Sequence, residues 1–361
     1  MKPLSSVLVA GGGTAGHVNP MLAVAVELRE LYPDAKILAL GTKEGLEEKL
    51  VPEAGFTLET IDRVPFPRNV NSYALSFPTK FYRALKKTKK LIIDHKVEVV
   101  FGVGGYVSTP AYLAAQQLGI PYVMHEANMI PGMANKMGVK KAAGVGLAFK
   151  EIPLEGGVYV GMPMKKSISG LDRKKHQRDA REQLGLNPYK KTLIVTGGSS
   201  GAQSINEALI KSLGLFDPEK FQILHIVGPG KKIEVRGASH HYHQREFITK
   251  MENVYAAADL LMCRAGSGTV SEVCAVGVPA IFVPLPVGNG EQKLNAQPVV
   301  DAQGALMIDN AELNSAYFKE TVIPTLEDDD KLASMSAIAY GIGKRDADVL
   351  MANMIAKVAQ Q

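Results

Sequence analysis

The sequence of 361 residues lacks the features that mark secreted or membrane-spanning proteins. It has only two cysteines, Cys263 and Cys274, in a glycine-rich segment read as helical, without the spacing of metal ligands. We therefore expect a protein of a reducing cytoplasm rather than one held by disulfides. No stretch approaches the roughly 18 uninterrupted apolar residues that a membrane-spanning helix needs. The first letters, MKPLSSVLVAGGG, run directly into an apolar strand, so we expect no signal peptide.

The signature of dinucleotide-binding domains is also missing. The first glycine-rich turn, GGGTAGH, has contiguous glycines rather than the spaced GxGxxG pattern. The second predicted strand ends in Leu40-Gly41-Thr42, where those domains carry an acidic residue that binds ribose. Both observations disfavour a nicotinamide-dependent oxidoreductase.

Two strand–glycine turn–helix units are present instead, about half the chain apart. They span residues 7–28 and 192–209, and each has a short apolar run, then glycines with Ser or Thr, then an amphipathic helix. Such a unit points backbone N–H groups and the positive end of a helix at one spot, which suits phosphate. We predict two α/β domains that hold an anionic substrate between them, a nucleotide or another phosphorylated compound.

Strand-like and helix-like segments alternate through both halves, which predicts a doubly wound parallel sheet in each. Ligands of such sheets gather at the carboxyl ends of the strands. We place a domain boundary in the stretch of low periodicity at residues 156–177 and assign residues 1–164 and 165–342 to the two domains. The last helix, within residues 343–361, is expected to pack back onto the first domain. The predicted strands are residues 7–10, 36–40, 97–105, 120–126, 192–196, 222–227, 260–263 and 279–284.

His17 closes the first glycine turn at the start of a helix. The helix dipole disfavours the protonated imidazole there, and a neutral imidazole can take a proton from a hydroxyl. The alternatives are a structural histidine and a tight turn that binds no ligand, because glycine is permissive in turns generally.

Polar loops follow two further strands of the same predicted sheet. FGVGGYVS (residues 101–108) ends in glycines, and HEANMIPGMANK (residues 125–136) supplies acid–base and hydrogen-bonding groups suited to sugar hydroxyls. A polar loop that merely caps strand ends is the other interpretation.

The second half offers the stronger phosphate candidate, GGSSGAQ, because Ser199 and Ser200 add hydroxyl donors to the backbone amides. In CRAGSGTVSEV, Glu272 lies on the first turns of a helix, where it either complements the dipole or accepts hydrogen bonds from both hydroxyls of a ribose. Glu291, Gln292 and Asn295 follow the next strand end.

The net charge of +5 belongs wholly to the first half, where residues 1–165 carry 19 Lys and Arg against 14 Asp and Glu. Six of these basic residues fall within residues 80–90, beside apolar anchors, an arrangement that suits an anionic membrane interface. A solvated helix with its apolar face in the core is the alternative. Nucleic acid ranks low, because no nucleic-acid-binding module surrounds the patch. The membrane-facing candidates are Phe77, Lys80, Phe81, Tyr82, Arg83, Lys86 and Lys87.

In this order, GGGTAGHVNP, GGYVSTP, HEANMIPGMANK, GGSSGA and CRAGSGTVSE with GVPAIFVPLP resemble the MurG family, peptidoglycan N-acetylglucosaminyltransferases that convert lipid I to lipid II. The resemblance covers roughly residues 7–310. It implies a GT-B fold, two Rossmann-like doubly wound domains with a deep interdomain cleft. The N-terminal domain would bind the lipid-linked acceptor, and the C-terminal domain UDP-N-acetylglucosamine. It also implies inverting transfer to the C4 hydroxyl of the N-acetylmuramyl unit, with UDP as the leaving group.

The resemblance assigns roles by position. His17 is the implied general base with Glu126 as substitute, and Glu272 the implied ribose ligand. The implied donor contacts are Thr14, Ala15, Gly16, Asn128, Lys165, Ser199, Ile248, Ser267, Gly268, Glu272, Glu291 and Gln292. The implied acceptor-side residues are Gly104, Gly105, Tyr106, His125 and Asn135.

Three positions depart from the family pattern. Ala15 stands where glycine is usual, and Lys165 where arginine often follows the proline. The arginine guanidinium can donate two parallel hydrogen bonds to a phosphate, whereas the lysine ammonium acts as a point charge. The substitution therefore weakens the case that Lys165 binds the diphosphate. Glu291 occupies one of two expected glutamine positions. No acidic triplet typical of metal-dependent transferases is visible, so no metal or other cofactor is expected to be required.

The implied partners are UDP-N-acetylglucosamine, undecaprenyl-linked lipid I, the anionic cytoplasmic face of the cell membrane and the cell-wall or division machinery, with no nucleic acid. Two other classes stay open. One is another enzyme of the same architecture, such as a UDP-sugar 2-epimerase or a different lipid glycosyltransferase. The other is a non-catalytic nucleotide-sugar-binding scaffold, which would bind the UDP-sugar without turnover.

Overall fold

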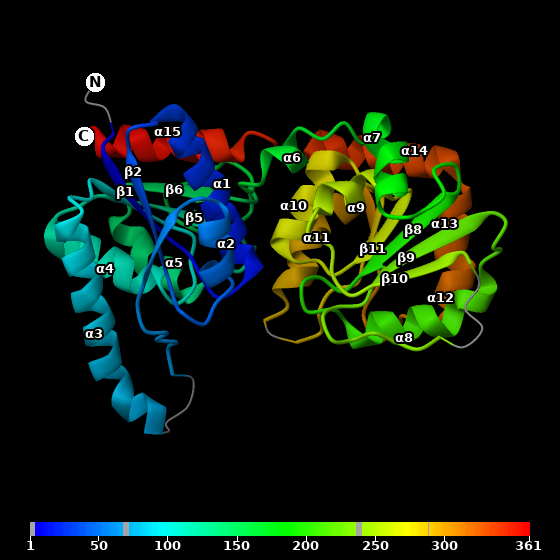
Figure 1. The fold of residues 1–361 in the computed structure, drawn as a ribbon, viewed down its shortest axis with the longest axis horizontal. Coiled ribbons are helices and arrows are strands. Elements are labelled where there is room, and N and C mark those ends of the chain that lie inside the picture. The colour runs from blue at the N-terminus through cyan, green and yellow to red at the C-terminus, as the bar shows by residue number, and fades with distance from the viewer. Residues whose placement is uncertain (1–3, 68–71, 236–239, 288) are drawn as a thin grey trace. The chain divides into compact units, whose positions relative to one another are not determined.

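The computed structural model describes residues 4–67, 72–235, 240–287 and 289–361. The chain divides into two compact units, each built around its own parallel sheet (Figure 1). Unit 1 comprises Met1–Lys165 together with Arg345–Gln361, and unit 2 comprises Lys166–Lys344. The predicted fold class, two doubly wound parallel sheets, is confirmed.

Unit 1 contains, within its described residues, a seven-stranded sheet of order β3-β2-β1-β4-β5-β6-β7 in which all pairs are parallel. Its strands are β1 Ser6–Ala10, β2 Lys36–Gly41, β3 Thr57–Thr60, β4 Val99–Gly102, β5 Tyr122–Glu126, β6 Gly144–Leu147 and β7 Gly157–Tyr159. Its α-helices are α1 Ala15–Leu31, α2 Glu47–Glu53, α3 Ser72–Asp94, α4 Ser108–Leu118, α5 Met133–Gly138 and α15 Ala347–Ala359, with a 3₁₀ turn at Val139–Lys141.

Unit 2 contains, in the part of the chain that is described, a six-stranded parallel sheet of order β10-β9-β8-β11-β12-β13. Its strands are β8 Lys191–Thr196, β9 Phe221–Ile226, β10 Tyr242–Arg245, β11 Leu260–Cys263, β12 Ala280–Phe282 and β13 Ala305–Met307. Its helices are α6 Lys166–Ser169, α7 Arg173–Gln183, α8 Gln203–Ser212, α9 Met251–Ala257, α10 Ser267–Val276, α11 Glu291–Asp301, α12 Ser315–Tyr317, α13 Ile323–Glu327 and α14 Asp329–Ile342, with a 3₁₀ turn at Leu213–Leu215 and a π-helical turn at Phe318–Val322.

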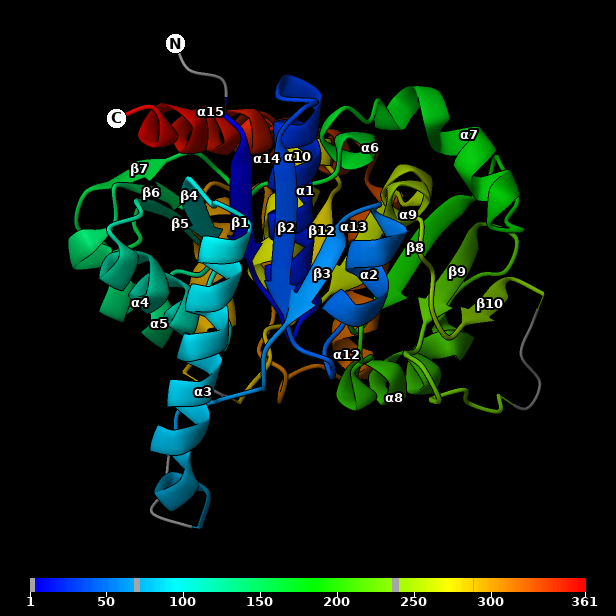
Figure 2. The same ribbon diagram turned by 60° about the vertical axis from the view of Figure 1, so that its left-hand side comes forward.

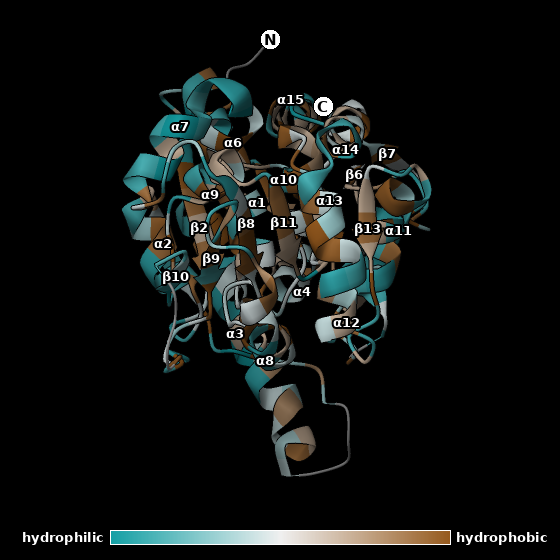
Figure 3. Cartoon of the chain, turned by 90° about the vertical axis from the view of Figure 1, so that its right-hand side faces the viewer, coloured by the Kyte–Doolittle hydropathy of each residue, from teal (hydrophilic) through white to brown (hydrophobic). Residues whose placement is uncertain are grey.

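The central strands form around short apolar runs, such as residues 7–10 in β1 and residues 99–101 in β4. All five residues of β1 are buried, as are the four of β4, which is the pattern of a parallel strand covered on both faces. In unit 2 the central strands β8 and β11 are largely hydrophobic and buried, while α7 is largely hydrophilic along its length (Figure 3). In each sheet the strand order reverses next to the first strand of the unit, between β1 and β4 and between β8 and β11. Turns at the carboxyl ends of these pairs are the expected ligand positions.

The C-terminal helix α15 belongs to unit 1, where it packs against α1. Met351 and Ile355 lie in the same buried cluster as Val7 and Val24. Gly146 on β6 makes this approach possible, because a Cβ there would lie 2.2 Å from Sδ of Met351. The end of the chain therefore completes the core of the first unit.

Helix α3 extends away from the sheet of unit 1 (Figure 2). Its later turns bury Ala84, Thr88 and Ile92, while Leu75 near its start is 82% exposed. Phe77 on this helix contacts the rings of Tyr73, Phe81 and Phe66, with the Phe66 and Phe77 centroids 5.3 Å apart. Within the described ranges, no helix has both the length and the apolar content needed to cross a membrane.

All eight strands expected from the sequence are present, as β1, β2, β4, β5, β8, β9, β11 and β12. Five were not expected, β3, β6, β7, β10 and β13, which have three or four residues each and lie at or next to a sheet edge. Strands of three or four residues give too short a signal in the sequence, even where they are apolar as in β13, so their pairing depends on the strand beside them. Cys263 ends β11, in agreement with the strand predicted at residues 260–263, and Cys274 lies in helix α10. The description of both cysteines as part of one helical segment is therefore correct for Cys274 alone.

Candidate active site

The first glycine turn joins β1 to α1. Gly13 has φ +90°, a conformation that a side chain would strain, and its amide is held by a 2.8 Å hydrogen bond to Oε2 of Glu47. Thr14 is the N-cap residue of α1, and its Oγ1 lies 3.2 Å from Nδ1 of His17. Ala15 and Gly16 begin the helix, so the predicted donor turn and His17 form one continuous feature.

The turn after β4 lies directly against the imidazole of His17. Gly104 and Gly105 have φ +91° and +82°. A Cβ on Gly104 would lie 3.5 Å from Nε2 of His17, and one on Gly105 would lie 3.0 Å from the carbonyl oxygen of Gly12. Because β1 and β4 are neighbours, the two glycine turns meet, and glycine leaves room for the ring.

Burial lowers the pKa of the His17 imidazole below its ordinary value of 6.5, although the Gly12 carbonyl and the charge of Glu47 act in the opposite direction. The His17 side chain is half-buried. A neutral imidazole at pH 7 has a nitrogen lone pair for a proton, as a general base requires.

Glu126 ends β5 and is buried. Its carboxylate accepts three hydrogen bonds, from the amides of Asn128 (3.0 Å) and Gly132 (2.9 Å) and from Nδ2 of Asn135 (2.9 Å). Burial raises the pKa of this carboxyl, while the hydrogen bonds oppose the rise. The carboxylate therefore organises the loop that carries Asn128.

Two predicted acceptor-side residues, His125 and Asn135, are buried and hydrogen-bonded within unit 1. His125 is fully buried, with Nε2 2.8 Å from the Gly161 carbonyl, and burial lowers its pKa to about 4. Asn135 is 1% exposed and donates to the His125 carbonyl, while its Oδ1 accepts from the hydroxyl of Tyr112 at 2.9 Å. His125 is buried because β5 is covered on both faces, whereas Asn135, on α5, is buried by its hydrogen bonds to the end of β5 and to Tyr112. A direct contact of either side chain with the acceptor stays a prediction.

Tyr106 fits the predicted acceptor side better, since it is 39% exposed. The guanidinium of Arg63 lies 4.9 Å from its ring centroid. Lys165 is exposed at the end of the first segment of unit 1, whereas the sequence analysis placed it at the start of the second domain.

In unit 2, the turn after β8 carries Ser199, which is exposed ahead of helix α8. Gly201 in this turn meets Gly228 after β9, since a Cβ on Gly228 would lie 2.7 Å from the Cα of Gly201. The glycines thus let two strand-end loops touch and leave the serines at the surface.

The turn after β11 leads into α10, whose first residues are Ser267 and Gly268. Glu272 lies one turn further along this helix and is partly exposed. The hydroxyl of Tyr255, on α9, donates a 2.5 Å hydrogen bond to Oε2 of Glu272. Ile248 stands between β10 and α9, partly buried.

Glu291 and Gln292 open helix α11. Oε1 of Gln292 accepts hydrogen bonds from the amides of Ala265 (3.2 Å) and Leu285 (3.0 Å), and so joins the loops after β11 and β12. The predicted donor residues of unit 2 therefore follow the carboxyl ends of β8, β10, β11 and β12.

Comparison with known proteins identifies the family. Residues 7–147 match the glycosyltransferase family 28 N-terminal domain, and residues 192–351 match its C-terminal domain. The chain is 49% identical to the UDP-N-acetylglucosamine–N-acetylmuramyl-(pentapeptide) pyrophosphoryl-undecaprenol N-acetylglucosamine transferase of Paenarthrobacter aurescens, over 98% of this chain and 96% of that protein. The enzyme of the same name from Streptomyces coelicolor is 45% identical over 97% of each chain. The chain belongs to the MurG family.

Solved structures agree. The crystal structure of MurG from Acinetobacter baumannii superposes with a TM-score of 0.76 at 28% identity, over 98% of this chain and 100% of that one. A UDP-N-acetylglucosamine 2-epimerase of Neisseria meningitidis reaches 0.71 at 14% identity, over 98% and 100% of the chains, which shows a shared fold alone. The two Rossmann-like units are those of a GT-B glycosyltransferase.

Two charged residues of this MurG family member were missed by sequence reasoning. Glu47 is fully buried and accepts from N and Oγ1 of Thr42 as well as from Gly13. No local pattern singles it out among the neighbouring glutamates of α2, because its partners lie in two other turns.

Arg264 is the second missed residue. Its guanidinium donates to the carbonyls of Val283 and Pro284, to Oδ1 of Asn310 and to Oγ of Ser204. It thereby ties together the loops after β11, β12 and β13 and the start of α8. Arg264 lies in the CRAG motif that the sequence analysis quoted. Its hydrogen-bond partners are 19 to 60 residues away in the sequence, so no local pattern indicates its role.

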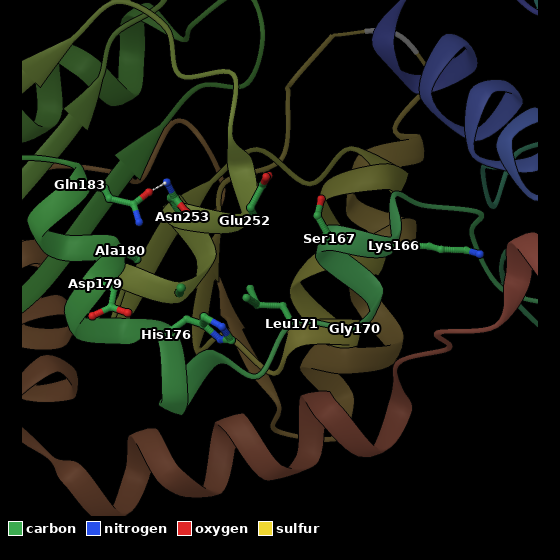
Figure 4. Close-up of a pocket in the computed structure, with 11 residues that line it drawn as sticks. Lys166, Ser167, Gly170, Leu171, His176, Asp179, Ala180, Gln183, Glu252 and Asn253 are labelled. Carbon is green, nitrogen blue, oxygen red and sulfur yellow. Dashed lines mark hydrogen bonds between the residues drawn. The ribbon is translucent and has the colours of Figure 1, made fainter. Parts of the chain in front are cut away.

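A cavity of about 330 Å³ lies elsewhere in unit 2, between α6, α7 and α9 (Figure 4). Leu171, His176 and Glu252 line it, and a 2.9 Å hydrogen bond from Asn253 to Gln183 closes one edge. None of its lining residues belongs to the predicted donor or acceptor sets. Among the described residues, no three His, Cys, Asp or Glu side chains gather as a metal site would require.

Proposed function

We propose that this chain transfers N-acetylglucosamine from UDP-N-acetylglucosamine to the C4 hydroxyl of the N-acetylmuramyl unit of lipid I, with inversion, giving lipid II. The carrying observation is 49% identity over 98% of the chain to an enzyme named for that transfer. Unit 1 would bind the acceptor, and unit 2 the nucleotide sugar.

His17 is the proposed general base. In a single displacement, the C4 oxygen forms a bond to the anomeric carbon, the bond from that carbon to the diphosphate breaks, and the hydroxyl proton goes to the base. Nδ1 lies beside Thr14 Oγ1, and Nε2 lies over Gly104, so Nε2 is the proposed proton acceptor. Glu126, the substitute candidate, already accepts three hydrogen bonds, which favours His17.

The donor would be held by the strand-end loops of unit 2. Glu272 would accept hydrogen bonds from the ribose hydroxyls, and the backbone at Ile248 would bind uracil. Ser199 and the start of α10, at Ser267 and Gly268, would stabilise the diphosphate charge that develops as UDP leaves. Asn128 and Gln292 are proposed for the sugar hydroxyls. Further proposed donor contacts are Thr14, Ala15, Gly16, Lys165 and Glu291, and the proposed acceptor-side contacts are Gly104, Gly105 and Tyr106.

Helix α3 would bring the enzyme to the anionic cytoplasmic face of the membrane. Leu75 and Tyr82 are 82% and 65% exposed, and Lys86 and Lys87 are exposed on the same helix. Exposed apolar anchors beside lysines suit binding to an interface with anionic lipids. Binding to the division machinery stays a prediction.

Transfer of labelled N-acetylglucosamine from its UDP conjugate to a lipid I analogue tests the proposal. Wild type should transfer the sugar, and His17→Ala should lose most of the rate, on the order of 10²-fold or more. Folded wild type that binds the UDP-sugar without transfer would instead favour a scaffold. Release of UDP without lipid acceptor would favour an epimerase.

A further inference from the structure

Tyr255 is a buried polar residue without a role in the proposed reaction. It lies on α9, is 1% exposed, and its hydroxyl donates to Oε2 of Glu272 on the neighbouring helix α10 at 2.5 Å. Burial, together with the charge of Glu272, raises the pKa of this phenol well above its ordinary value, so the hydroxyl stays a donor. A donor–carboxylate contact of this length is a strong, charge-assisted hydrogen bond.

The direction of the bond restricts the carboxylate. Glu272 is partly exposed, whereas Tyr255 is fixed in the interior by packing. A glutamate side chain has three rotatable bonds, and ordering them costs conformational entropy when a ligand binds. The hydrogen bond from Tyr255 orders one carboxylate oxygen of Glu272 when the protein folds. The entropy cost is therefore not incurred again when the ligand binds.

The position of α9 adds a second constraint. The helix begins at Met251, shortly after Ile248, and Tyr255 lies one turn into it. One short rigid element therefore connects the segment proposed to bind uracil with the carboxylate proposed to bind ribose.

We propose that Tyr255 is a positioning residue that orients Glu272 toward the ribose hydroxyls and thereby sets the preference of the donor site for ribonucleotides over 2′-deoxyribonucleotides. The inference rests on the proposed role of Glu272 as the ribose ligand. Tyr255 touches neither substrate nor leaving group in this proposal and acts through the glutamate alone.

Calorimetric binding of UDP and of 2′-deoxy-UDP to the full chain tests this without the lipid acceptor. Wild type should prefer UDP by about tenfold or more, the effect of a hydrogen bond to a charged group. Tyr255→Phe keeps the ring and its packing but removes the donor. It should weaken UDP binding by about tenfold, change 2′-deoxy-UDP binding less, and reduce the preference to about twofold or threefold.

Tyr242→Phe is the matched control. Its hydroxyl lies 2.8 Å from Nδ1 of His225 and accepts from Gln244 at 3.0 Å, so this variant also loses a partly buried hydroxyl of unit 2. It should leave the ratio of the two dissociation constants unchanged. An equal loss of the ratio in both tyrosine variants would overturn a specific role for Tyr255.

Glu272→Gln separates the inference from the function on which it rests. If Glu272→Gln loses the preference for UDP while Tyr255→Phe keeps it, Glu272 binds ribose and the positioning role of Tyr255 is overturned. If Glu272→Gln keeps the wild-type preference, the ribose assignment itself fails. Loss of the preference in both variants supports the proposal.

Discussion

The backbone amide of Gly13 donates a 2.8 Å hydrogen bond to Glu47, 34 residues further along the chain. The second oxygen of the same carboxylate accepts from N and Oγ1 of Thr42, both at 2.8 Å. One buried side chain thus fixes the turns after β1 and β2, and its charge opposes the effect of burial on the pKa of His17.

Glu47→Gln should therefore change the pH dependence of transfer. A base works when deprotonated, so the rate rises with pH through the pKa of His17. Loss of the Glu47 charge lowers that pKa further, and the acid limb of kcat/KM should move to lower pH. The amide also places an NH₂ group against backbone donors, which should lower the free energy of unfolding by about 2 kcal/mol.

Glu48→Gln removes the same charge from an exposed neighbour and should leave the acid limb in place. An unshifted limb in Glu47→Gln would contradict the coupling.

Glu272→Ala should raise the Michaelis constant for UDP-N-acetylglucosamine by about 10-fold to 100-fold, the worth of hydrogen bonds to a charged group. The Michaelis constant for the lipid acceptor should change little, since Glu272 lies in unit 2. Steady-state kinetics with each substrate varied in turn give both values. Equal increases in the Michaelis constants for the donor and for the lipid acceptor would contradict the assignment of Glu272 as the ribose ligand.

Acid should destabilise both units through buried neutral histidines. Burial lowers the pKa of His125 in unit 1 and of His225 in unit 2 to about 4, below the ordinary value of 6.5. Between those values the unfolded chain binds more protons, so stability rises with pH and is lost as pH falls from about 6.5 to about 4. Each histidine should cost about 2 kcal/mol at pH 5 relative to pH 7.

Urea unfolding at pH 7 and pH 5, with a probe in each unit, measures this loss. His225→Gln should flatten the pH dependence of unit 2 while leaving that of unit 1 intact. His176→Gln changes an exposed histidine of unit 2 and should leave both dependences as in wild type. A pH dependence of unit 2 that survives His225→Gln would assign the acid sensitivity to other groups.

Replacement of Lys86, Lys87, Lys89 and Lys90 by glutamine should weaken binding to anionic vesicles by several kcal/mol, at about 1 kcal/mol for each basic residue near the surface. Sedimentation with vesicles containing anionic lipid gives the partition coefficient, and added salt should reduce it for wild type. A matched variant changes Lys174, Lys175, Lys231 and Lys232, which are exposed on unit 2, and should bind like wild type. Unchanged vesicle binding by the α3 variant would show that these lysines do not bind the membrane. It would favour the alternative, a solvated helix with its apolar face in the core.

Much of the fold could be read from local patterns. Apolar runs such as Val7 to Ala10, with glycines directly after them, predicted the central strands and the turns that carry His17 and Ser199. Short edge strands such as β3 and β7 escaped, because strands of that size are stabilised by their neighbours and carry little signal of their own.

The sequence by itself determined the two α/β units, the positions of the glycine turns and the family to which the chain belongs, because these depend on residue type and spacing along the chain. Only the tertiary structure decided which polar residues at the strand ends are exposed and which are buried and hydrogen-bonded beneath them. His125 and Asn135 turned inward, and Glu47, Arg264 and Tyr255 emerged as supports, because each takes partners from elements distant in the chain. A hydrogen bond across strand ends leaves no period in the sequence, so it becomes visible only when the parallel strands are placed side by side.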